Sequence, residues 1–82
     1  MTYTVLKTSS IVEPEVYVCD DYAEAARLLN GIRDVMAAGG IPAITDTPDH
    51  CMFRADTGHT WAATIVERAQ LSPYWKNREV AA

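Results

Sequence analysis

The sequence lacks the features that mark three broad classes of protein. Its 7 Lys and Arg residues are outnumbered by 11 Asp and Glu, so the basic surplus that attracts nucleic-acid phosphates is missing. The longest apolar run, from Val35 to Ile44, is too short and too broken by Gly and Pro to span a bilayer. No basic stretch followed by an apolar one resembles a secretory signal, and there are only two cysteines, Cys19 and Cys51. We therefore expect a cytoplasmic protein that contacts neither nucleic acid nor membrane directly.

The composition is that of a folded domain of modest size. Hydrophobic residues make up 49% of the chain and charged residues 22%, far from the composition of disordered segments. The chain has no internal repeat, no low-complexity tract and no linker long enough to divide it. The sequence therefore predicts a single domain over residues 1–82.

One amphipathic helix is expected from about Asp21 to Ala38. Asp21 with Glu24 three residues later has the spacing of a capping box, with Asp in the role of Ser or Thr. The apolar residues that recur at the spacing of one buried stripe are Ala25, Leu28, Leu29, Ile32, Val35 and Met36. Gly39 and Gly40 then end the periodic segment, so the helix has defined limits on both sides.

A β-hairpin is expected before this helix, with strands at about 2–7 and 12–19 and a loop at 8–10. In the second strand two sets alternate, Val12, Val16 and Val18 on one side and Glu13, Glu15 and Tyr17 on the other. We expect the valines to face the core and the other three to face water. Pro14 favours an edge position for this strand, because proline cannot donate to a ladder.

A second hairpin is expected after the helix, with strands at about 50–55 and 59–67 and the loop Asp56-Thr57-Gly58. With this three-residue loop, Phe53 lies opposite Trp61. One face then gathers Cys51, Phe53, Ala55, Trp61, Ala63 and Ile65. A two-residue loop would place Arg54 opposite Trp61 and mix the faces, so we prefer the longer loop.

The remaining segments carry weaker signals. Residues 41–44 are compatible with a short edge strand, residues 45–49 are typical of a surface loop, and residues 71–82 have no clear period and read as an irregular tail. The sequence thus predicts an α+β fold in ββαββ order. Two β-hairpins form a small antiparallel sheet, and the helix between them packs on one sheet face.

Cysteine and histidine are the residues to consider for a metal site or a nucleophile. Cys19, His50, Cys51 and His59 include no paired C-x2-C ligands, and the neighbours His50 and Cys51 would point to opposite sides of a strand. Cys51 with His50 or His59, oriented by Asp56, could be a catalytic pairing, but Cys51 is expected in the core face and His59 at the turn. We therefore expect no metal, no cofactor and no catalytic residue, and the protein is predicted not to be an enzyme.

An RNA-binding surface is a further alternative. It would use Tyr17, Tyr74, Trp75, Lys76 and Arg78. Without a basic stripe the sequence does not favour it. Gly39 and Gly40 follow a helix instead of preceding one, which is the wrong end for a phosphate loop.

Acidic residues gather in the first part of the chain. Residues 1–24 hold five carboxylates against a single base, Lys7. The candidates for partner binding are these five acids and the tyrosine among them, Glu13, Glu15, Tyr17, Asp20, Asp21 and Glu24. Such a surface would steer a protein partner with a basic surface, and interfaces favour an aromatic side chain inside a charged rim. The alternative is that the acids only solvate the surface and cap the helix.

In length, acidity and lack of catalytic motifs, the chain resembles the small acidic proteins of phages and mobile elements, including anti-CRISPR proteins. The resemblance extends from the Tyr3–Val5 strand through the Asp21–Ala38 helix to the Asp56-Thr57-Gly58 hairpin. It implies a non-enzymatic protein-binding module that inhibits a host defence nucleoprotein complex by steric or charge blocking.

Two alternatives stay open. The first is a self-associating structural or accessory protein of a phage or bacterium, which forms a homodimer through the strand near Pro14 or through Tyr74 and Trp75. The second is a small enzyme or metal-binding protein that uses Cys and His.

Overall fold

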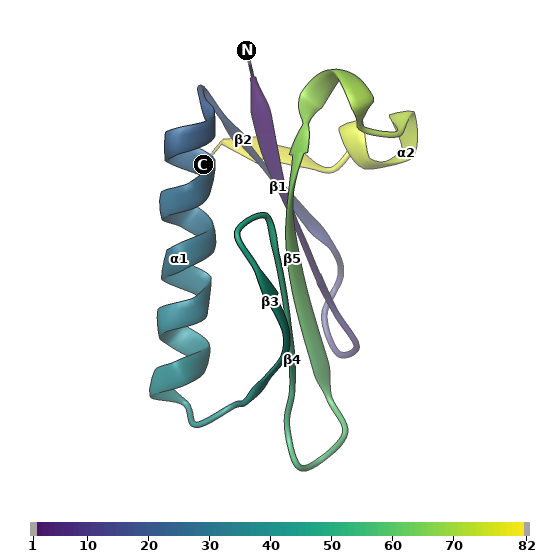
Figure 1. The fold of residues 1–82 in the computed structure, drawn as a ribbon. Helices are drawn as coiled ribbons and strands as arrows, with labels where there is room; N and C mark the ends of the chain where they lie inside the picture. Colours follow the sequence, from purple (N-terminus) through teal and green to yellow (C-terminus); the bar gives the residue numbers. More distant parts are fainter. Residues whose placement is uncertain (1, 82) are drawn as a thin grey trace.

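The computed structural model describes residues 2–81, which form one mixed sheet with a long helix against one face (Figure 1). The elements along the chain are β1 Tyr3–Ser9, β2 Glu15–Cys19, α1 Tyr22–Ala38, β3 Ala43–Thr47, β4 His50–Arg54, β5 Thr60–Glu67, a 3-10 turn Arg68–Gln70, α2 Pro73–Lys76 and β6 Glu79–Ala81. The strand order is β3-β4-β5-β1-β2-β6, and all neighbours are antiparallel except β2 and β6. The α+β class and the antiparallel sheet with its helix are confirmed. The ββαββ order is wrong, because β3, β4 and β5 all follow α1.

The two predicted hairpins meet through β1 and β5. Their antiparallel pairing runs from Tyr3 opposite Glu67 to Ser9 opposite Trp61. Thr4, which is fully buried, is satisfied within this pairing, because its hydroxyl donates to the carbonyl of Val66 at 2.9 Å. β1 therefore has a neighbour on each side and lies inside the sheet.

α1 begins and ends through local contacts. The side chain of Asp21, the N-cap, accepts a hydrogen bond from the backbone N–H of Glu24 at 2.8 Å, as the capping box predicted. At the other end Gly40 adopts a left-handed φ of 72°, and the N–H of Ile41 donates to the carbonyl of Met36 at 3.0 Å. The helix therefore stops at the two glycines, as expected.

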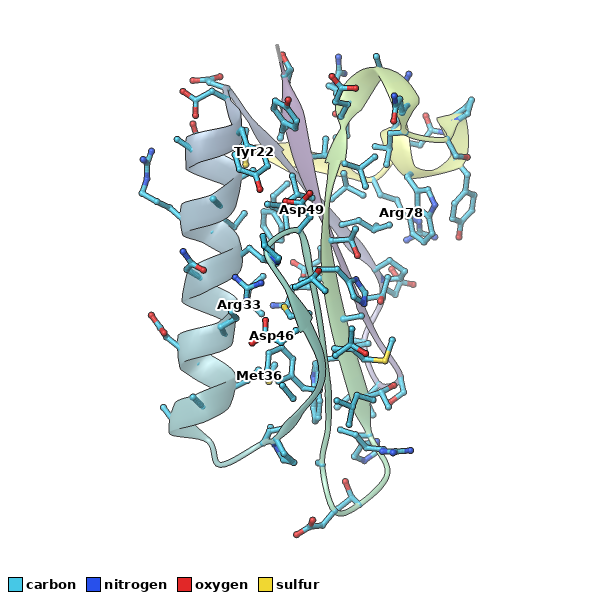
Figure 2. All side chains as sticks on the ribbon, viewed as in Figure 1. Tyr22, Arg33, Met36, Asp46, Asp49 and Arg78 are labelled. Atoms are coloured by element: carbon cyan, nitrogen blue, oxygen red, sulfur yellow. The ribbon has the colours of Figure 1, made fainter. Side chains whose placement is uncertain are left out.

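The core lies between α1 and the sheet. The buried residues in it are Ala25, Leu29 and Met36 from α1, and Val5, Cys19, Cys51, Phe53, Ala63 and Ile65 from the strands. Figure 2 shows Met36 pointing from α1 toward the sheet. Val35 was predicted to lie in the same stripe but is 69% exposed. Its neighbour Met36 faces the sheet, and Val35 points about 100° away from Met36 around the helix.

β2 is shorter than predicted, and both of its sides are covered. Val16 is fully buried, and Tyr17 packs against the core under α1 instead of facing water. The reason is that Tyr17 lies opposite Val5 and so shares its side of the sheet. Val12 precedes the strand and is 57% exposed. The edge position that Pro14 suggested is also wrong, because β2 lies between β1 and β6.

The hairpin of β4 and β5 has the predicted loop and register. Phe53 lies opposite Trp61. Gly58 has a φ of 92°, and its N–H donates to the carbonyl of Ala55 at 2.9 Å. This is the geometry of a three-residue loop with glycine in the left-handed position.

β3 occupies part of the segment that was predicted to be a surface loop. Pro48 and Asp49 form the turn to β4, and Thr47 lies opposite His50. The prediction followed the turn-forming residues of 45–49, but only the last two of them form the turn. The β-branched residues of Ala43–Thr47 favour a strand once β4 is beside them.

Two side chains of α1 reach across to this hairpin. Arg33 donates from Nε to a carboxylate oxygen of Asp46 at 2.8 Å and from a terminal nitrogen to the carbonyl of Thr47. The hydroxyl of Tyr22 donates to the carboxylate of Asp49. In Figure 2 both side chains point from α1 toward their partners on β3 and its turn. The helix therefore holds the outermost strand as well as the core of the sheet.

The C-terminal segment is ordered, so the prediction of an irregular tail at 71–82 is wrong; Ala82 lies outside the described residues. Leu71 is buried, and Ser72 caps the short α2, which lies on the side of the sheet away from α1 (Figure 1). β6 then pairs in parallel with β2. Arg68 holds Glu79 of β6 through hydrogen bonds of 2.6 and 2.9 Å. This order depends on partners far away along the chain, which the local sequence does not reveal.

We expect Arg33→Gln to lower the free energy of unfolding by about 1–2 kcal/mol, because it removes charge-assisted hydrogen bonds between α1 and β3. Urea unfolding followed by circular dichroism measures this change. Arg54→Gln is the matched control, since Arg54 is an exposed residue of β4 without an ion pair among the described residues. Equal destabilisation by the two variants would contradict the role of Arg33.

Candidate functional site

The six residues predicted to bind a partner fall into three groups. Asp20, Asp21 and Glu24 lie together where β2 leads into α1. Glu15 and Tyr17 lie along β2, and Glu13 lies before that strand. The structure therefore brings together half of the predicted set.

We call Asp20, Asp21 and Glu24 the acidic end. Their contacts are local: Asp21 caps α1, and the carboxylate of Glu24 accepts from the backbone N–H of Asp20 at 3.3 Å. Asp20 and Asp21 are exposed, and Glu24 is half-buried. Burial raises the pKa of the Cys19 thiol, and the negative charges of Glu24, Asp20 and Asp21 raise it further. All three carboxylates therefore lie close enough to the Cys19 thiol, at the end of β2, to raise its pKa.

The other predicted acids are engaged elsewhere. Glu15 accepts a hydrogen bond of 2.6 Å from the hydroxyl of Tyr17, and this bond is the main cause that raises the pKa of Tyr17. Glu13 lies 3.7 Å from the guanidinium of Arg78, with its side chain 90% exposed. Neither carboxylate extends the acidic end.

Tyr22 is the residue of this region that the sequence did not single out. Its side chain is half-exposed beside the acidic end, and its ring meets that of Tyr3 edge-on at 5.5 Å. The hydroxyl of Tyr22 donates to the carboxylate of Asp49, and this hydrogen bond raises the pKa of Tyr22. Asp49 follows 27 residues later in the chain, so no local pattern joins the two. The only available signal was an aromatic residue directly after the N-cap.

The cysteines and histidines do not form an evident reactive group. His50 Nδ1 lies 2.7 Å from the hydroxyl of Thr64, whereas its neighbour Cys51 is fully buried. Burial raises the pKa of the Cys51 thiol, with Arg33 opposing this shift, so the thiol is protonated at neutral pH. Within residues 2–81, no three His, Cys, Asp or Glu side chains are grouped so that they could hold a metal ion.

The residues of the RNA-binding alternative are divided between the two sides of the sheet. Tyr74 and Trp75 meet edge-on at 4.9 Å, and the guanidinium of Arg78 lies 5.2 Å from the centre of the Tyr74 ring. Tyr17 packs under α1, on the side of the sheet away from α2. Arg78 is already paired with Glu13. The five side chains therefore do not form one basic and aromatic surface.

Comparisons with known proteins identify no family and no relative. No protein-family model, no curated protein and no solved structure matches the chain. Among the described residues no helix has both the length and the apolar character needed to cross a membrane.

The two buried thiols predict a loss of stability in alkali. In the folded chain their pKa values lie above the ordinary 9.0, so unfolding is accompanied by thiol ionisation once the pH exceeds that value. The stabilisation is complete below pH 9.0 and is lost as the pH rises through the folded pKa values. Urea unfolding from about pH 8 to about pH 10 should show this decline in the wild type, and a weaker decline in Cys19→Ala with Cys51→Ala. An unchanged slope in the double variant would refute the assignment to the thiols.

Proposed function

We propose that the chain is a non-enzymatic protein-binding module that works in the cytoplasm and whose acidic end binds a basic surface of a protein partner. The observation that supports this most directly is the grouping of three carboxylates without cations of their own. The ion pairs among the described residues join Arg33 with Asp46, Arg68 with Glu79, and Arg78 with Glu13. None of them uses a carboxylate of the acidic end, so its charge is available to another molecule.

The surroundings of the acidic end suit an interface. Tyr22 offers a half-exposed aromatic ring beside the charges, and aromatic residues are enriched where proteins meet. Its ring is held by Tyr3 and its hydroxyl by Asp49, so little side-chain freedom is lost on binding. Negative charges at the first turn also interact favourably with the helix dipole.

The proposed partner is a host defence nucleoprotein complex, as in the anti-CRISPR proteins that the chain resembles. Such complexes hold nucleic acid in positively charged channels, which an acidic module can cover. With 11 acidic residues the chain has too few charges to imitate a long duplex. Blocking by the bulk of the bound module is therefore part of the proposal, with the acidic end providing steering and orientation.

A plaquing assay tests this proposal. Bacteria with a CRISPR–Cas system directed against a phage are given the chain, and we expect plaquing to be restored for at least one CRISPR type. Asp20→Lys should weaken binding to the purified effector complex roughly tenfold, because it reverses a charge without removing the helix cap.

Asp56→Lys is the matched control, since it makes the same charge change in the loop between β4 and β5. We expect it to bind like the wild type. Plaquing that stays absent in every CRISPR type tested would overturn the proposed partner, and equal effects of the two variants would overturn the role of the acidic end.

A further inference from the structure

One flank of α1 is apolar but uncovered. Val35 is the most exposed large hydrophobic side chain among the described residues. It borders a groove of about 390 Å³ between α1 and β1, whose other apolar walls come from Leu28, Ile32 and Met36. Contiguous exposed apolar surface is typical of sites that contact another molecule.

Gly31 lies on the same flank, and nothing within residues 2–81 requires it to be glycine. Glycine within a helix costs about 1 kcal/mol of stability relative to alanine. Gly31 has no positive φ, and a Cβ at this position would meet no atom of the described residues within 4 Å. A glycine here does allow the backbone of a second helix to come close.

The spacing of this flank is that of a helix-pairing seam. Leu28, Gly31, Val35 and Ala38 follow one another at intervals of three, four and three residues. Arg27 and Asp34 each lie directly before one of the larger apolar residues, and so on the same side of the seam. Within residues 2–81 neither of the two charges has an ion-pair partner.

These charges indicate the orientation of a second helix with the same sequence. A half-turn about an axis through Gly31 brings residues whose numbers add up to 62 to the same height. Arg27 of one copy then lies within one residue, about 1.5 Å along the axis, of Asp34 of the other. The symmetry produces this pair twice, whereas in a parallel arrangement Arg27 of one copy and Asp34 of the other would lie on opposite sides of the seam and could not pair.

We infer that a second copy of this chain binds along α1, antiparallel to it and centred on Gly31. Leu28, Val35 and Ala38 supply the apolar contact, and Arg27 pairs with Asp34 of the second copy. The contact follows one helix of 17 residues, so the dimer belongs to the small, weak class with a Kd of about 10–100 µM. In this register Ala38 of one copy lies at the height of Glu24 of the other, so the seam reaches the acidic end. The inference does not rest on the proposed function, because none of its apolar contacts or charge pairs uses a carboxylate of the acidic end.

Sedimentation equilibrium of the purified chain tests the dimer. The average mass should rise from 9.0 kDa toward twice that value as the concentration passes through the micromolar range. Val35→Glu should weaken the dimer at least tenfold without changing the circular dichroism, because Val35 is exposed. Val12→Glu, at an equally exposed valine outside α1, should leave it unchanged. A wild type that stays monomeric up to about 1 mM would overturn the inference.

Two further variants test the antiparallel arrangement. Arg27→Asp and Asp34→Arg should each weaken association about tenfold, and their combination should restore it, since the opposite charges meet again. A combination as weak as the single variants would overturn this register.

Gly31→Gln should raise the melting temperature, because Gln favours a helix more than Gly does, and yet weaken the dimer about tenfold. Unfolding cannot produce these two opposite changes together. Unweakened association of Gly31→Gln would show that the helices do not approach each other at this point.

Discussion

The structure depends on the pairing of β1 with β5. This pairing joins residues 3–9 to residues 61–67 and makes one sheet of two hairpins that would each be marginal alone. It places Val5 beside Ile65 in the centre of the face that α1 covers. It also makes a large contribution to the entropic cost of folding. The segment between β1 and β5 spans most of the chain, and its two ends must meet before the central contacts form.

The parts that the sequence predicted are those decided by neighbours along the chain. The cap at Asp21, the stop at Gly40 and the loop that ends with Gly58 each depend on residues a few positions apart. β3 was predicted only in part, as a possible short edge strand at 41–44, because the turn-forming residues 45–49 concealed its second half. β6 was missed because its order comes from β2, a distant partner along the chain. The exposure of Val35 depends on where the helix lies on the sheet, which periodicity alone leaves open.

The difference between local and distant partners also explains which residues of the candidate site could be predicted. Asp20, Asp21 and Glu24 were predicted to lie together and do so, because a strand end and the first helical turn hold them within five residues of sequence. Tyr17 was placed on the wrong side of β2, since alternation shows which residues share a side but not which side meets the helix when both are covered. Tyr22 and Asp49 could be joined only by the tertiary fold.

The two borders of the sheet affect how the protein behaves at high concentration. An open border exposes unpaired backbone groups that can recruit further strands and begin cross-β aggregation. Here Arg33 ties up the carbonyl of Thr47 on one outer strand, and the other outer strand, β6, has only three residues. Within residues 2–81 both outer strands are therefore short, which limits the template that either border offers to further strands.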